Sequence, residues 1–88
     1  VGAFPLSLQS IPIDFLAADG HKWMLGPEGA GLLFIRQKHI EQLMPIMMGW
    51  GSVIPSLSFD PTATELKPHA GRYEGGSMNM AGCSGLAA

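Results

Sequence analysis

The chain has 88 residues, of which 47% are hydrophobic and 14% charged, and its formal net charge is −2. A chain of this length makes at most one small domain, which buries only about 60% of its unfolded surface. The low charged fraction indicates that most of its faces are covered by something else. The net negative charge and the absence of a basic run exclude a nucleic-acid partner. No apolar run approaches the roughly 18 residues of a membrane span, so no membrane partner is expected.

The ends and the cysteine content give two further expectations. The chain opens on Val1 without an initiator methionine and closes on GCSGLAA, which reads as the first turns of a helix without a stop signal. We therefore expect a piece of a longer protein. The single cysteine, Cys83, cannot form an internal disulfide, which favours a reducing, cytoplasmic location.

The first half of the chain predicts two strands and a helix. Residues 11–19 are apolar on both alternating faces apart from Asp14, which is typical of a covered, parallel-type strand. A glycine- and proline-rich turn separates this run from a second strand at residues 30–35. Residues 37–44 have helical apolar spacing, and Pro45 ends that helix. The fold class expected is α/β.

The second half is mostly irregular. Residues 48–76 show little periodicity and are rich in proline and glycine. So long an irregular segment is uncommon in a compact domain unless it is functional or packs on another chain. The methionines before it are soft and adaptable side chains that suit such an interface. A helix is predicted to begin near residues 78–80, with Asn79 as its N-cap.

A lysine stands at the end of the first predicted strand, within GHKW. Lys22 has two readings. Its stem could lie on apolar surface while the ammonium reaches water, as most lysines do. Alternatively it is a desolvated amine of lowered pKa that forms a Schiff base with a carbonyl. The neighbouring donor His21 and the flanking glycines favour the second reading, as does the place at a strand's carboxyl end.

A second motif, RYEGGSMN at residues 72–79, precedes the last predicted helix. Free backbone N–H groups at Gly76, the Ser77 hydroxyl and a helix N-terminus together make an anion site. A flexible turn with a serine N-cap explains the same residues equally well.

Both motifs resemble segments of the class V aminotransferase family. GHKW followed by GPEGAG and an apolar strand is similar to the family's lysine segment. RYEGGS is similar to its pattern of arginine, aromatic, glutamate, small residue, glycine and threonine, at a similar distance after the lysine. The resemblance implies that residues 1–88 are part of the large catalytic domain of a fold-type I enzyme that uses pyridoxal 5'-phosphate and acts on an amino acid.

The resemblance also implies roles for four residues. Lys22 would form the Schiff base with pyridoxal phosphate and then act as the proton-transfer base at the substrate's α-carbon. His21 would donate to the cofactor phosphate. Gly76 and Ser77 would reach across a homodimer to the phosphate bound by the other subunit, with serine in place of threonine. The cofactor's other contacts, including the aspartate at its pyridine nitrogen, are expected outside these 88 residues.

The match departs from the family in one place. Cysteine desulfurases have serine where Asp19 stands, and a carboxylate would repel phosphate unless it turned away, so no phosphate role is carried onto Asp19. Trp23 and the GPEG turn are more similar to the isopenicillin N epimerase-like branch. For Trp23 itself we expect simple packing, and for Arg72 and Glu74 a local ion pair that shapes the loop.

The remaining candidates are expected to be structural. In the family, the nucleophilic cysteine of a desulfurase lies on a mobile loop well beyond this segment, so Cys83 is expected to be a buried thiol. His39 and His69 have no partners at metal-ligand spacing and are expected on the surface, so no metal site is predicted.

Three functions stay open at this point. The first is a pyridoxal-phosphate enzyme, with cysteine desulfuration preferred and an isopenicillin N epimerase-like or aminotransferase activity as its alternatives. The second is a non-catalytic relative that serves as a dimeric interaction module, which Asp19 keeps open. The third, a small α/β binding domain with accidental motif matches, requires two motifs to agree by chance in order and interval. In any of these cases we expect the isolated segment to be inactive.

Overall fold

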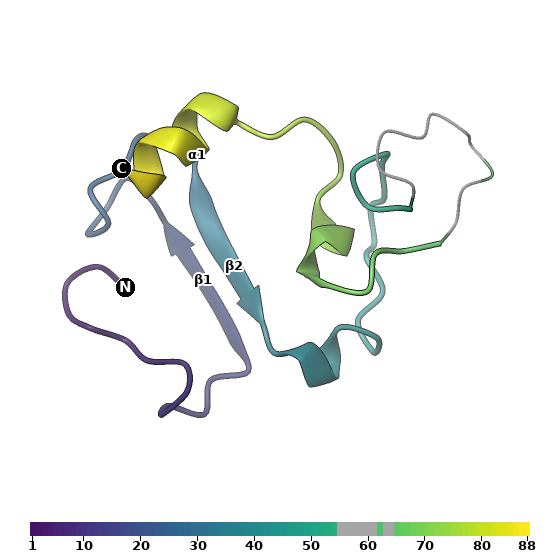
Figure 1. The fold of residues 1–88 in the computed structure, drawn as a ribbon, viewed down its shortest axis with the longest axis horizontal. Helices are drawn as coiled ribbons and strands as arrows, with labels where there is room; N and C mark the ends of the chain where they lie inside the picture. Colours follow the sequence, from purple (N-terminus) through teal and green to yellow (C-terminus); the bar gives the residue numbers. More distant parts are fainter. Residues whose placement is uncertain (55–61, 63–64) are drawn as a thin grey trace. The chain divides into compact units, whose positions relative to one another are not determined.

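A computed structural model describes residues 1–54, 62 and 65–88. These residues form two compact units (Figure 1). Unit 1 comprises Val1–Arg36 and Asn79–Ala88, and unit 2 comprises Gln37–Met78. No helix among the described residues is long and apolar enough to cross a membrane.

Unit 1 is built on a two-stranded antiparallel ribbon. Strand β1, Phe15–Asp19, pairs with β2, Gly31–Ile35, in a register that sets Phe15 opposite Ile35 and Asp19 opposite Gly31. The expectation of a parallel-type strand is wrong for this pair. Only residues 20–30 connect the strands, and a parallel neighbour would need a longer crossover.

One face of the ribbon is exposed among the described residues. Residues directly opposite each other in an antiparallel pair share a face, so Phe15 and Ala17 lie on the same side as Leu33. Phe15 and Leu33 are each 53% exposed. The prediction that β1 is covered on both faces is therefore not met within these residues, and its apolar pattern fits cover from outside them.

Helix α1, Met80–Ala87, lies beside the end of the ribbon where β1 ends and β2 begins (Figure 1). Its predicted cap is confirmed, because the Asn79 side chain accepts a hydrogen bond from Gly82 N at 2.9 Å. The same side chain donates to Gly29 O at 3.1 Å. Asn79 thus satisfies a free N–H of the first helical turn and ties the helix to the loop between the strands.

Unit 2 contains two short 3-10 helices, η1 at Gln37–His39 and η2 at Ala70–Tyr73. The helix predicted over residues 37–44 is wrong beyond η1. Proline at position 45 disfavours the helical conformation only for the residue before it. The carbonyl of Ile40, which a helix would bond to the N–H of residue 44, accepts from Arg72 Nη1. The apolar spacing is used instead to bury Ile40, which is 1% exposed.

The expected irregular segment, residues 48–76, is regular only at η2 and at one isolated bridge, Val53 to Leu66, among its described residues. Part of that prediction lies outside the described residues. At the end of the segment, η2 is capped by His69, whose Nδ1 accepts from Gly71 N at 3.1 Å. His69 is exposed, as expected, and acts as a cap.

Candidate active site around Lys22

Lys22 lies in the turn that follows β1, in a loop that is closed on itself by backbone hydrogen bonds. Gly20 N donates to Ala30 O at 2.9 Å, and Gly26 N donates to Gly20 O at 2.8 Å. Within this loop Leu25 N donates to Lys22 O at 3.0 Å. The lysine is therefore carried by a defined turn at the end of a strand, as its place in GHKW predicted.

Gly20 allows that closure. A Cβ at this position would lie 2.6 Å from Ala30 O and about 3.1 Å from Leu86 Cδ1 on α1. The carbonyl is backbone and cannot rotate aside as a side chain does. A residue with a side chain at position 20 would open the base of the loop, so the glycine before His21 and Lys22 sets where these residues emerge from the ribbon.

The amine of Lys22 is paired with a carboxylate rather than desolvated. Lys22 Nζ lies 2.6 Å from Asp19 Oδ2, and the two side chains are 66% and 56% exposed. The expectation of a desolvated amine is thus wrong for these 88 residues. The apolar run ends at β1, and the turn carries the lysine away from the ribbon into solvent.

The Asp19 carboxylate is the partner of the lysine. The hydrogen bond from Lys22 and its positive charge hold the pKa of the Asp19 carboxyl below its ordinary value of 3.8, with a smaller contribution from His21 in the same direction. The carboxylate is ionised at neutral pH and its charge is balanced by the neighbouring ammonium. Asp19 therefore turns toward the lysine.

We expect the pKa of Asp19 to rise toward 3.8 when Lys22 is replaced by methionine, because both leading causes of the lowering are then removed. Stabilisation by the pair is present above pH 3.8 and is lost as pH falls through the lower folded-state value. Since the pair is exposed, that stabilisation is small. A carboxyl-carbon NMR titration of the cofactor-free full-length protein measures the pKa. Lys38→Met is the control, and an Asp19 pKa that Lys22→Met leaves unchanged contradicts the pairing.

The neighbours of Lys22 in the turn are open to solvent. His21 is exposed, and its charge acts on Asp19. Trp23 is 72% exposed, so the expected packing of its ring is not found within the described residues. The turn thus presents an amine, an imidazole and an indole on one short exposed segment.

The second predicted group lies in unit 2. Gly76 is half-buried beside the Trp50 ring, because a Cβ on Gly76 would lie 3.4 Å from Trp50 Nε1. Ser77 is exposed and precedes the α1 cap, Asn79. The alternative interpretation, a flexible turn with a serine N-cap, is therefore wrong about the cap, because Asn79 and not Ser77 caps α1. Within unit 1 the structure brings His21, Lys22 and Asp19 together, and Gly76 and Ser77 are adjacent in unit 2.

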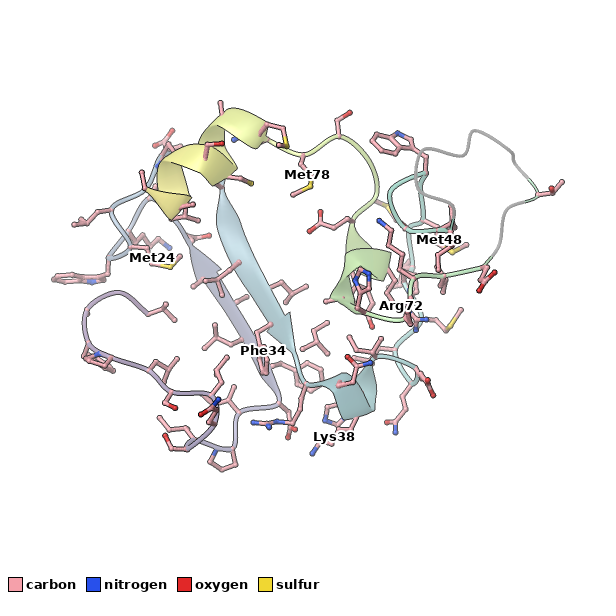
Figure 2. The ribbon with its side chains drawn as sticks, viewed as in Figure 1. Met24, Phe34, Lys38, Met48, Arg72 and Met78 are labelled. Carbon is pink, nitrogen blue, oxygen red and sulfur yellow. The ribbon has the colours of Figure 1, made fainter. Side chains whose placement is uncertain are left out.

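Arg72 has another role than the predicted pairing with Glu74. Its side chain, labelled in Figure 2, is 8% exposed and donates from Nε to Lys67 O at 2.8 Å and from Nη1 to Ile40 O at 2.5 Å. Tyr73 Oη adds a bond to Leu43 O at 2.9 Å. Arg72 and Tyr73 therefore bind backbone carbonyls of unit 2, and these bonds fix the start of the segment that leads to Gly75 and Gly76.

Cys83 is half-buried in α1 rather than fully buried, and His39 is half-buried rather than on the surface. In the part of the chain that the structure describes, no group of three His, Cys, Asp or Glu side chains could hold a metal ion. Sequence reasoning missed one residue of the second motif's surroundings, Ser52. The turn-forming glycines of GWGS were its only signal.

An exposed lysine turn at the end of a strand in a small α/β unit fits the class of enzymes that bind a carbonyl cofactor through lysine. The Aminotransferase class-V family model matches residues 1–88. The chain belongs to the class-V aminotransferase family, a family of pyridoxal-phosphate enzymes.

Relatives and a solved structure agree with this assignment. A probable cysteine desulfurase of Xylella fastidiosa (strain Temecula1 / ATCC 700964) is 40% identical over 83 residues, which cover 94% of this chain and 19% of that protein. The isopenicillin N epimerase of Streptomyces clavuligerus is 39% identical over 64 residues, 73% of this chain and 16% of that protein. The apo structure of a cysteine desulfurase from Thermococcus onnurineus NA1 matches with a TM-score of 0.80 at 34% identity, over 98% of this chain and 21% of that one.

The structural match confirms the expected fold class. The chain has the α/β fold of a segment of a fold-type I enzyme. It spans about a fifth of the length of the curated relatives it matches.

Proposed function

We propose that this chain is the cofactor-lysine segment of a pyridoxal-phosphate enzyme that acts on an amino acid, with cysteine desulfuration as its reaction. The observation that carries the proposal is the exposed Lys22 turn at the end of β1 in a chain of this family. The named desulfurases among the relatives favour that reaction over epimerisation or transamination.

The donor set fits the cofactor. An exposed primary amine is the group that an aldehyde requires, and the imidazole of His21 beside it is a donor for an anion. In the cofactor-free chain the carboxylate of Asp19, which would oppose a phosphate, is paired with the Lys22 ammonium. Lys22 would release a proton from this ammonium before its amine could react with the aldehyde, so the pairing with Asp19 would hold the lysine in place only until the cofactor binds.

The roles of the chain's residues follow from this chemistry. When bound, the cofactor supplies an aldehyde for covalent attachment and a conjugated ring that stabilises negative charge at the substrate's α-carbon. Lys22 would hold the cofactor in place and, when released by the amino acid, move the proton at the α-carbon. His21 would donate to the phosphate, and Asp19 would keep the free amine oriented between these steps.

The partner in this proposal is a second copy of the protein, with Gly76 and Ser77 contacting the phosphate bound by the other subunit. Its support is the exposed apolar segment of residues 44–48 in unit 2, where Ile46 is fully exposed and Met47 is 82% exposed. Side chains of this kind are depleted on free surfaces and enriched in interfaces. Sedimentation of the full-length protein at the mass of a single chain would contradict this part of the proposal.

Borohydride reduction of the full-length protein incubated with pyridoxal phosphate tests the cofactor and the lysine together. We expect peptide mass mapping to place a reduced pyridoxyl group on Lys22. Lys38, an exposed lysine on η1, is the internal control and should stay unmodified at stoichiometric cofactor. An unmodified Lys22 in a folded protein would instead favour the non-catalytic interaction module.

A further inference from the structure

A buried serine joins two backbone segments of unit 2. Ser52 is 0% exposed, and its hydroxyl donates to Glu74 O at 2.9 Å. The same oxygen accepts from Gly49 N at 3.2 Å. The turn of residues 49–52, called here the glycine bracket, is thereby bound to the residues that precede Gly76.

The two segments touch backbone to backbone. Gly51 N donates to Gly75 O at 3.3 Å. A Cβ on Gly51 would lie 2.7 Å from Glu74 O, and a Cβ on Gly49 would collide with Gly75 O. Only residues without a side chain allow this approach, so both glycines of the bracket are explained by the contact.

The bracket is itself anchored on its other side. Ser52 N donates to Gly49 O at 2.9 Å, which closes the turn. Lys67 N donates to Ser52 O at 3.0 Å, and the bridge between Val53 and Leu66 continues that pairing. Ser52 therefore forms hydrogen bonds through its N–H, its carbonyl and its hydroxyl. These bonds link residues 74–75 to the rest of unit 2.

This contact matters because two glycines follow it. Glycine has the largest backbone freedom of any residue type, so ordering Gly75 and Gly76 costs more conformational entropy than ordering other residues. Glu74 O and Gly75 O accept hydrogen bonds from the bracket, and Gly76 lies beside the Trp50 ring, so the backbone that leads to Ser77 is held on the protein side without a ligand. Preorganisation of this kind lowers the cost of binding.

We propose that Ser52 is a positioning residue that orders the Gly76–Ser77 loop for the phosphate group of the cofactor. The proposal rests on the proposed function. It assigns to Ser52 no contact with the cofactor, only the placement of the backbone that contacts it. Its consequence is selective: the loop contributes to binding of the phosphate and leaves the reaction of Lys22 with the aldehyde unchanged.

The experiment compares two ligands on the cofactor-free full-length protein, pyridoxal phosphate and pyridoxal, which lacks the phosphate. Dissociation constants are measured by calorimetric titration. In Ser52→Ala we expect the Kd for pyridoxal phosphate to rise about tenfold, as when one backbone residue must be ordered on binding. The Kd for pyridoxal should stay within about twofold of the wild-type value.

The controls separate placement from general stability. Ser10→Ala removes a serine hydroxyl that donates to Ser7 O in unit 1, and it should change neither Kd. Gly51→Ala keeps the Ser52 hydroxyl but forces a Cβ toward Glu74 O, and it should reproduce the selective loss. If Ser52→Ala does not fold, this second variant still tests whether the contact between the bracket and residues 74–75 places the loop, and equal Kd values to wild type would overturn the inference.

The possible outcomes are distinct. Equal weakening of both ligands would show that Ser52 supports the fold alone and would overturn the inference. Unchanged binding of both ligands in Ser52→Ala and Gly51→Ala would overturn it as well, with the proposed function intact. A wild-type protein that binds neither ligand would overturn the proposed function and the inference together.

Discussion

Lys22→Ala is expected to abolish turnover of the full-length enzyme, with a loss of at least about 10²- to 10⁴-fold in kcat, the usual contribution of a positioned proton-transfer group. The loss exceeds that of a binding residue because one amine serves both covalent attachment and proton movement. Steady-state kinetics with an amino-acid substrate, cysteine first, measure it. Covalent attachment of pyridoxal phosphate should disappear in the same variant.

The matched control is Lys38→Ala, which removes another exposed lysine from η1 in unit 2. It should keep wild-type kcat and KM. Lys22→Arg separates charge from chemistry, because guanidinium preserves the ion pair with Asp19 but is not deprotonated in proteins. It should be as inactive as Lys22→Ala. Activity retained in Lys22→Arg would contradict the assignment of Lys22.

The isolated 88-residue chain is expected not to unfold cooperatively. Among the described residues, Ile40 and Val53 are the buried apolar side chains. Many large apolar side chains stay in water, including Phe15, Leu33 and Ile46. A two-stranded ribbon and an eight-residue helix are each marginal alone.

Circular dichroism during heating measures this property. The isolated chain should lose its signal gradually, while the full-length protein should give a sigmoidal transition. Addition of pyridoxal phosphate should not restore cooperativity to the isolated chain, because the cofactor's other contacts are expected elsewhere in the protein. A sharp, reversible melt of the isolated chain would contradict the prediction.

Much of the fold was accessible from local patterns. The two apolar strands, the turn between them and the Asn79 cap each depend on a few consecutive residues and are present. The first strand begins at Phe15 rather than at residue 11, and it pairs antiparallel rather than as a parallel-type strand. The helix predicted over residues 37–44 is wrong beyond η1, because apolar spacing reports which side chains are buried and not which backbone carbonyls are bound by other segments. The single 3-10 turn η1 is enough to bury Ile40, so burial of this side chain does not require the longer helix.

In the candidate site, too, one residue follows from the local sequence and its partner does not. The place of Lys22 after a strand and between glycines predicts its role, and that role stays a prediction. From the sequence, Asp19 is expected only to repel a phosphate, and its pairing with the amine of Lys22 is not predicted. Spacing of three residues permits an ion pair but does not require it, and the turn geometry decided the matter.

Adjacent residues are enough to predict the family, the lysine turn and the glycine-rich loop, because the chemistry of each is local. The antiparallel register, the carbonyl partners of Arg72 and the burial of Ser52 follow only from the folded chain. The hydroxyl of Ser52 meets Glu74 across 22 positions of the chain. Nothing in a local pattern encodes such a contact, since it exists only when folding brings two distant stretches of backbone into reach.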